Sequence, residues 1–163
     1  MTAKGHVILA ITPLTAAYGS SLIAMPEVLI PVVLGSLFND IDEPASYIGR
    51  KFFFLSGLFR ELGLKHRGFT HFLIIPLVLM ILAYLAFEGG ILFWFAFGML
   101  MHDIGDMLTK GGIVSFFYPF AEGKRAALLP EPLRFKTFSF TEKIVIFVLI
   151  LINLVNTMGV NYV

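Results

Sequence analysis

Three apolar stretches limit what this sequence can fold into more than any other feature. Each is long enough, or nearly long enough, to supply the ~20 helical residues that cross a bilayer core, and they run over Phe69–Phe87, Gly90–Leu108 and Ile144–Met158. Two shorter helices are expected before them, over residues 5–20 and 24–39. Because 58% of the residues are hydrophobic, more than a soluble domain of this length buries, the sequence predicts an all-α, polytopic membrane helical bundle of about five transmembrane helices.

The basic residues predict how this bundle lies in the membrane. Such residues concentrate in cytoplasmic loops, and all twelve Lys and Arg residues fall on one side of the five-helix arrangement. They are Lys4, Arg50, Lys51, Arg60, Lys65, Arg67, Lys110, Lys124, Arg125, Arg134, Lys136 and Lys143. We therefore expect a multi-pass protein of the inner, cytoplasmic membrane, with its N-terminus inside and its C-terminus outside. A re-entrant segment over residues 5–39 would keep the same sidedness.

The chain is expected to form one membrane-embedded domain over residues 1–163, with cytoplasmic loops over residues 43–68 and 110–143. In the first loop, residues 50–62 mix phenylalanines with basic residues, which suits a short helix lying in the membrane interface. A solvated loop with a few buried aromatic side chains is the alternative. Residues 115–140 have a similar composition and are expected to form an ordered interfacial loop.

The first apolar run has an alternative interpretation as a cleaved signal peptide. Residues 1–21 carry a single lysine, an apolar run from Val7 and small residues at Ala16, Ala17 and Gly19, which such a peptide would also show. A second apolar run follows within a few residues, and this favours a helical hairpin.

Charge and composition exclude several classes of function. The formal net charge is only +1, so the sequence has no clustered excess of basic residues for nucleic-acid binding. Cysteine is absent, which excludes disulfides, thiolate zinc sites, iron–sulfur clusters and cysteine nucleophiles. Membrane lipids are the expected partners, and the oligomeric state is left open.

An acidic cluster follows the second expected helix. Asp40, Asp42 and Glu43 occupy three of four positions directly after an apolar run. One interpretation is a polar stop at the membrane surface, but acidic residues contribute little to topology. Carboxylates placed this close raise one another's pKa unless a cation neutralises them. The cluster therefore favours a metal site.

Two histidines precede the third expected helix. His66 and His71 lie five residues apart around a glycine, with Arg67 and Thr70 between them. They fit ordinary interfacial histidines as well as metal ligands. Arg67 offers a planar fork suited to a phosphate or carboxylate, and a topology-determining positive charge is its alternative role.

Ionisable residues also end the fourth expected helix. His102 and Asp106 are four residues apart and share a helix face that Thr109 continues. Such groups in a membrane helix are costly and indicate function, although a His–Asp hydrogen bond between helices is the alternative. Asp103 points about 100° away and need not belong to the same site.

The predicted topology gathers these residues at one membrane face. His6 begins the first helix, Asp40 and Asp42 end the second, and the two remaining pairs begin the third and end the fourth. Imidazoles and carboxylates together suit Zn²⁺, Mn²⁺ or Fe²⁺. The expected metal ligands are His6, Asp40, Asp42, His66, His71, His102 and Asp106. They outnumber the four ligands of one tetrahedral ion, so one or two divalent ions are expected, with Zn²⁺ first.

These residues resemble a known family. The motifs Thr2–His6, Gly35–Pro44, His66–His71 and His102–Thr109, followed by Gly112 and Pro119, are similar in order to those of the LexA-regulated, membrane-bound metal-dependent hydrolases, the YdjM-like inner-membrane proteins. The resemblance implies a metal-dependent hydrolase of the cytoplasmic membrane and names no substrate. The pattern is more distantly similar to zinc-dependent phospholipase C enzymes, which favours phosphoesters by analogy alone.

Three positions depart from the family pattern. Asn39 stands where the family usually has proline, and Glu43 stands where it has histidine. A ligand role at position 43 therefore passes to a carboxylate or is lost. Asp103 replaces a usual apolar residue, which adds a charge without an evident purpose.

The leading hypothesis is hydrolysis of a lipid-linked ester, a phosphoester first, by water that the metal activates. Glu43 or Asp103 would act as general base and Arg67 would hold the anionic group. Thr70 and Thr109 would orient ligands through hydrogen bonds. The alternatives are metal transport or sensing without hydrolysis, and a structural metal in a membrane interaction protein of a stress response.

Overall fold

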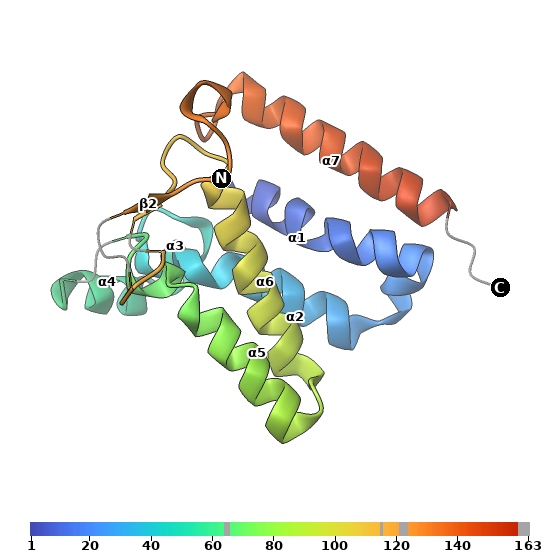
Figure 1. Ribbon diagram of the computed structural model, residues 1–163, viewed down its shortest axis with the longest axis horizontal. Coiled ribbons are helices and arrows are strands. Elements are labelled where there is room, and N and C mark those ends of the chain that lie inside the picture. The colour runs from blue at the N-terminus through green and yellow to red at the C-terminus, as the bar shows by residue number, and fades with distance from the viewer. Residues whose placement is uncertain (64–65, 115, 121–123, 160–163) are drawn as a thin grey trace.

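The computed structural model describes residues 1–63, 66–114, 116–120 and 124–159. Across these ranges helices dominate, which confirms the expected all-α class (Figure 1). One small antiparallel ribbon, in which β1 (Ile113–Val114) pairs with β2 (Arg125–Ala126), was not expected from the sequence. Lys65 and Ser115, which belong to the two expected cytoplasmic loops, lie outside the described residues.

The helices follow the expected order with shifted boundaries. The long helices are α1 (Ala3–Tyr18), α2 (Pro26–Phe38), α5 (Ile74–Phe87), α6 (Gly90–Met107) and α7 (Phe140–Gly159). Short α-helices are α3 (Tyr47–Lys51) and α4 (Phe53–Glu61). The 3-10 turns are η1 (Gly19–Ala24), η2 (Asn39–Asp42), η3 (Phe69–His71) and η4 (Glu131–Leu133).

Within the described residues, two helices are long and apolar enough to cross a membrane by themselves, whereas about five were expected. They are α1 with its η1 extension, Ala3–Ala24, and α7. Helix α5 has only 14 residues, or roughly 21 Å at 1.5 Å per residue, against a bilayer core of about 30 Å. The residues before Ile74, expected in this helix, instead form η3 and a break that turns His71 into the interior.

The long helices spread from one end of the molecule (Figure 1). We call this the polar end, because it holds the ionisable residues His6, Asp40, His71, His102 and Asp106. The start of α1 meets the end of α6, since His6 lies beside Asp106. The end of α2 reaches the same place through Asp40, and the start of α5 reaches it through His71. Helix ends that the sequence places on one membrane face therefore lie together in the structure.

Close packing of α2 on α6 sets the position of the acidic turn η2. A Cβ added at Gly35 would collide with the carbonyl oxygen of Phe95, and one added at Gly98 would collide with that of Val32. Small residues at such a crossing let two membrane helices approach closely. The end of α2 is thereby held against the middle of α6, about one turn before His102.

A network of hydrogen bonds joins α7 to α1 in an otherwise apolar stretch. Asn153 Nδ2 donates to Thr12 Oγ1 at 3.0 Å, and Asn156 Nδ2 donates to Thr15 Oγ1 at 3.2 Å. Polar side chains of this kind hold membrane helices together. Much of the remaining surface of α7 is exposed and apolar, as expected for a helix that faces lipid.

Helix α4 presents a row of exposed aromatic side chains at the polar end. Phe53 and Phe54 are 77% and 73% exposed, and Arg60 lies in the last turn of the same helix. A helix is therefore present in the segment where an interfacial helix was expected. Its position in the membrane interface stays a prediction.

Candidate metal centre

Five of the seven expected metal ligands converge at the polar end. They form two groups whose ligand atoms lie within 4.8 Å of one another: His6, Asp40 and His102, and His71, His102 and Asp106. Asp40 is 20% exposed, and the other four are buried to 1% exposure or less. His102 is common to both groups.

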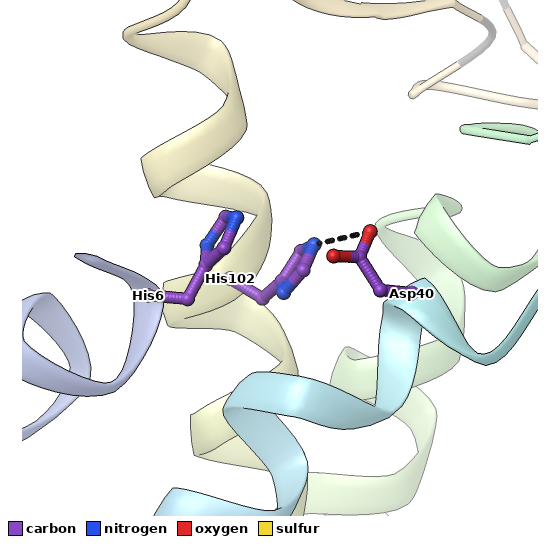
Figure 2. A group of neighbouring side chains, drawn as sticks. All are labelled: His6, Asp40 and His102. Atoms are coloured by element: carbon purple, nitrogen blue, oxygen red, sulfur yellow. Dashed lines mark ion pairs between the residues drawn. The ribbon is translucent and has the colours of Figure 1, made fainter. Parts of the chain in front are cut away.

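The imidazole of His102 is oriented by the backbone of α2. Its Nδ1 lies 2.7 Å from the carbonyl oxygen of Ser36, and a carbonyl only accepts, so Nδ1 carries the proton. Nε2 then faces Asp40 Oδ1 at 3.5 Å and Asp106 Oδ2 at 3.9 Å. Figure 2 shows this nitrogen pointing at the Asp40 carboxylate. A second-shell partner of this kind is typical of a metal-binding histidine.

His71 is oriented by a chain of two hydrogen bonds. Thr70 Oγ1 donates its only proton to Asp42 Oδ2 at 2.7 Å, so the same hydroxyl oxygen accepts from His71 Nδ1 at 2.9 Å. Nε2 of His71 is thereby left with its lone pair, 3.8 Å from Asp106 Oδ2. Thr70 thus hydrogen-bonds to the far side of the His71 ring, and Asp42 lies behind Thr70. The roles of both residues in a metal site stay a prediction.

Both oxygens of Asp106 face nitrogen atoms. Oδ2 faces His71 and His102, and it also lies 2.9 Å from Arg67 Nε. Oδ1 lies 3.4 Å from His6 Nε2 and forms an ion pair with the amino group of Met1. Asp106 is therefore the carboxylate around which the other groups gather.

Several buried ligand atoms have no hydrogen-bond partner in the described part of the chain. They are Nε2 of His71, Nε2 of His102, Oδ2 of Asp106 and both ring nitrogens of His6. Buried polar atoms without partners are rare and costly. A divalent cation between these atoms would satisfy them, so the residues present fit a metal ion.

The spacing of the ligand atoms suits tetrahedral coordination. Bonds of about 2.0–2.2 Å place the ligands of a tetrahedral ion roughly 3.3–3.6 Å apart. Asp106 Oδ2 lies 3.8 Å from His71 Nε2 and 3.9 Å from His102 Nε2, so these three ligand atoms require a contraction of only a few tenths of an ångström. Asp40 belongs to the other group, with its Oδ1 3.5 Å from His102 Nε2. Imidazole nitrogens and carboxylate oxygens form a donor set that Zn²⁺, Mn²⁺ or Fe²⁺ accept.

His6 lies differently from the other two buried imidazoles. Its ring stacks on that of His102, with centroids 3.6 Å apart and planes at 5° (Figure 2). Imidazole lone pairs lie in the ring plane, so one ion cannot lie in both of these parallel planes. His6 instead pairs with the opposite oxygen of Asp106, as it would beside a second ion bridged by that carboxylate. The number of ions stays a prediction.

His66 and Asp42 form an outer pair at the mouth of the cluster. His66 Nδ1 lies 2.9 Å from Asp42 Oδ1, and the His66 side chain is 33% exposed. Burial lowers the pKa of His66, but its hydrogen bond to Asp42 outweighs this and raises the pKa above the ordinary value.

Asp40 has the opposite shift. Burial raises the pKa of Asp40, but its contact with His102 outweighs this and keeps that pKa below its usual range.

Three expected site residues lie away from the ligand groups. Glu43 accepts a hydrogen bond from the backbone N–H of Ala45 at 3.0 Å. Thr109 donates to the backbone carbonyl of Asp106 at 2.8 Å, where α6 ends. Asp103, fully buried, accepts from Asn39 Nδ2 at 2.8 Å. Two residues that depart from the family pattern, Asn39 and Asp103, are therefore hydrogen-bonded to each other.

The Asn39–Asp103 pair predicts an effect on stability without an effect on metal content. Asp103→Leu leaves the buried amide of Asn39 short of a partner, which costs about 1–3 kcal/mol. Replacing both residues by leucine should recover most of that loss, because neither polar group is then left unpaired. Thermal unfolding in detergent, together with metal analysis of all variants, checks this. A loss of metal in Asp103→Leu would instead place Asp103 in the centre.

Three residues that support the site were not found from the sequence. Ser36 acts only through its carbonyl, which no side-chain pattern reveals. Gly105 makes room for His6, since a Cβ added at Gly105 would lie 2.9 Å from His6 Nδ1. Gly105 lies three residues after His102 on the same helix face, and this spacing could have indicated that it belongs to the site. Glu142 accepts from the backbone N–H of Thr2 at 2.6 Å and so ties the start of α7 to the start of α1.

Comparison with known proteins identifies the family of the chain. A family model described as YdjM inner membrane protein matches residues 1–162. The chain belongs to the YdjM family. The resemblance drawn from the sequence motifs is thereby confirmed at the level of this family. No solved structure matches the chain significantly.

The individual relatives place the chain in the membrane. It is 31% identical over 129 residues to the inner membrane protein YdjM of Escherichia coli (strain K12) and to that of Shigella flexneri. This match covers 69% of the chain and 63% of each relative, less than two thirds of their length. The uncharacterized protein YvsG of Bacillus subtilis (strain 168) is 33% identical over 151 residues, 90% of the chain and 88% of the relative. As a YdjM-family protein with apolar helices that can span a bilayer, the chain is an inner-membrane protein, as the sequence predicts.

Proposed function

We propose that this protein is a metal-dependent hydrolase acting on a lipid-linked ester, with a phosphoester as the first candidate. The observation that carries the proposal is the convergence of Nε2 of His71, Nε2 of His102 and Oδ2 of Asp106. All three atoms are buried and lack a hydrogen bond among the described residues, although Oδ2 of Asp106 also forms an ion pair with Arg67. The opposite nitrogen of each imidazole is held by a hydrogen bond. A purely structural cluster would not need three ligand atoms directed at the same point.

The metal would be held by His71, His102 and Asp106, with Asp40 beside His102 in the adjoining group. A divalent cation at this position would polarise the ester and lower the pKa of water toward ~7. Asp40 is the member of the ligand groups nearest to solvent, so we place the proton acceptor there rather than at Glu43 or Asp103. His66 Nε2 lies 4.0 Å from Asp40 Oδ1 and is placed to pass that proton to solvent.

Arg67 is placed to bind the anionic group of the substrate. Its Nε pairs with Asp106, and its Nη1 donates to the carbonyl oxygen of Gly112 at 2.9 Å. The guanidinium has five N–H donors, so these contacts leave donors for a phosphate. The backbone of Arg67 has a φ of 62°, an uncommon conformation for a non-glycine residue that is concentrated at functional sites.

The surroundings of the centre support a substrate from the membrane. Exposed phenylalanines of α4 and basic residues, among them Arg60, Lys110 and Arg134, lie in the segments that follow α2 and α6 in the chain. A mixture of aromatic and basic side chains is typical of a surface that meets lipid head groups. We propose that the polar end faces the cytoplasm, because basic residues concentrate on that side.

Metal transport is the alternative that an experiment must separate from hydrolysis. A path across the membrane would need polar groups beyond the centre. The polar groups found between α1 and α7 hydrogen-bond to one another and to the backbone of their own helices. This arrangement supports a role in helix association rather than in conduction.

Purified protein in detergent is expected to contain a divalent metal and to cleave a phosphoester. Elemental analysis by mass spectrometry should find about one or two ions per chain. Treatment with EDTA should abolish the release of product from a panel of phospholipids and chromogenic phosphoesters, and added Zn²⁺ or Mn²⁺ should restore it. Entry of metal into proteoliposomes without ester cleavage would support transport, and metal-free protein would contradict both functions.

A further inference from the structure

An apolar groove of about 590 Å³ lies beside the metal centre. Its volume is within the range of about 300–1,000 Å³ that small-molecule sites occupy. The residues that line it are Gly63, Gly68, Phe69, Phe72, Ile74, Ile75, Tyr118 and Pro119. Among these, only the Tyr118 side chain carries a polar group.

The walls of the groove are continuous with the residues of the centre. Gly68 follows Arg67 and Phe72 follows His71, and consecutive Cα atoms are 3.8 Å apart. Phe72 stacks on Tyr118 with ring centroids 4.7 Å apart. The N–H of Leu73 donates to the carbonyl oxygen of Phe116 at 3.0 Å. The same segment that presents His71 to the metal therefore also builds one wall of the groove.

The other end of the groove continues onto the exposed apolar surface of α5. Ile74, in the groove, is 41% exposed, and Leu77 and Val78 one turn later are 40% and 44% exposed. The exposed row extends to Ile81 and Leu85. A chain leaving the groove in this direction would remain on an apolar helix surface of an inner-membrane protein.

We propose that the groove holds a hydrocarbon chain of an anionic membrane lipid, whose head group reaches Arg67 and the metal centre. Three observations favour this occupant: the apolar lining, the direct sequence neighbourhood of two lining residues to Arg67 and His71, and the exposed apolar surface of α5. The identification of this lipid as the substrate rests on the proposed function. Binding of the lipid does not, because the groove and Arg67 are present whether or not an ester is cleaved.

Photolabelling of the full chain tests the proposal. The protein is reconstituted in nanodiscs of phosphatidylethanolamine that contain phosphatidylglycerol with a diazirine in its acyl chain. Mass spectrometry is expected to find the label on peptides containing Phe72 and Tyr118. Ile75→Trp, which fills the groove, should reduce that label about tenfold. Ile81→Trp, on the exposed face of α5 outside the groove, is the matched control and should leave it unchanged.

The outcomes separate this proposal from the proposed function. Label in the groove without hydrolysis of any ester supports the lipid site and contradicts the hydrolase. Equal labelling of both tryptophan variants and wild type, or crosslinks between two copies of the chain at Tyr118, would overturn the lipid site. If esters are cleaved, Ile75→Trp should lower kcat/KM for long-chain phospholipids and spare short chromogenic phosphoesters. Metal analysis of both variants confirms that the centre is intact.

Discussion

Replacing His102 by alanine is expected to remove the bound metal and all hydrolysis that depends on it. His102 is the one residue shared by both ligand groups, and its Nε2 faces Asp40 and Asp106. Removing a hydrogen-bond partner of a metal ligand typically costs 10–100-fold in metal affinity. Removing a ligand that joins both groups should therefore cost more than about 100-fold. Metal titration of the EDTA-treated protein measures the loss.

A graded series of variants makes this expectation specific. Thr70→Val removes the hydroxyl that orients His71 and should weaken metal binding by about 10–100-fold. Asp103→Asn keeps a polar partner for Asn39 and should leave metal affinity unchanged. Circular dichroism and gel filtration show whether each variant remains folded. Equal affinity in His102→Ala and wild type would remove His102 from the centre.

The gathering of the centre at one end of the molecule could be predicted from the sequence. The positions of the basic residues fix which helix ends share a membrane face, and His6, Asp40, His71 and His102 all fall at those ends. The structure brings these four residues together. The position of a residue along a membrane helix gives its depth in the membrane, since each residue adds 1.5 Å. That depth was enough to predict which residues lie at the same end of the molecule.

The angular arrangement of the centre could not be predicted in the same way. Asp42 and Asp40 are two residues apart, yet one orients His71 through Thr70 and the other faces His102. The difference arises because η2 is a 3-10 turn rather than a continuation of α2. Glu43, the next residue along, turns back to its own loop. Depth in the membrane alone therefore does not distinguish a candidate metal ligand from the residue next to it in the sequence.

The break before α5 was also hidden in the sequence. Residues 69–87 form an unbroken apolar run by composition apart from Thr70 and His71, so hydropathy predicts one long helix. In the structure the regular helix begins only at Ile74. The residues before it are held in the interior, where His71 faces Asp106 and Thr70 donates to Asp42. Tertiary contacts of two polar side chains therefore decided the helix boundary. The resulting break also forms one wall of the apolar groove.

Asp106→Asn is expected to destabilise the protein even when no metal is present. Asp106 faces the cation of Arg67 at 2.9 Å, and only 19% of the Arg67 side chain is exposed. Breaking a buried ion pair by removing one partner costs about 3–5 kcal/mol, because the remaining charge loses its compensation. Partial exposure of Arg67 places the expected loss near the lower limit, about 3 kcal/mol. For a chain of this size that corresponds to a fall in Tm of roughly 6–12 °C.

Comparison in EDTA separates this effect from the loss of metal. Under these conditions neither wild type nor variant gains stability from a bound ion, so Asp106→Asn should still have a lower Tm than wild type. Combining it with Arg67→Met should restore part of the loss, since the uncompensated charge is then removed. If Asp106→Asn unfolds at the wild-type temperature in EDTA, Asp106 serves the metal alone and the Arg67 contact contributes nothing to the fold.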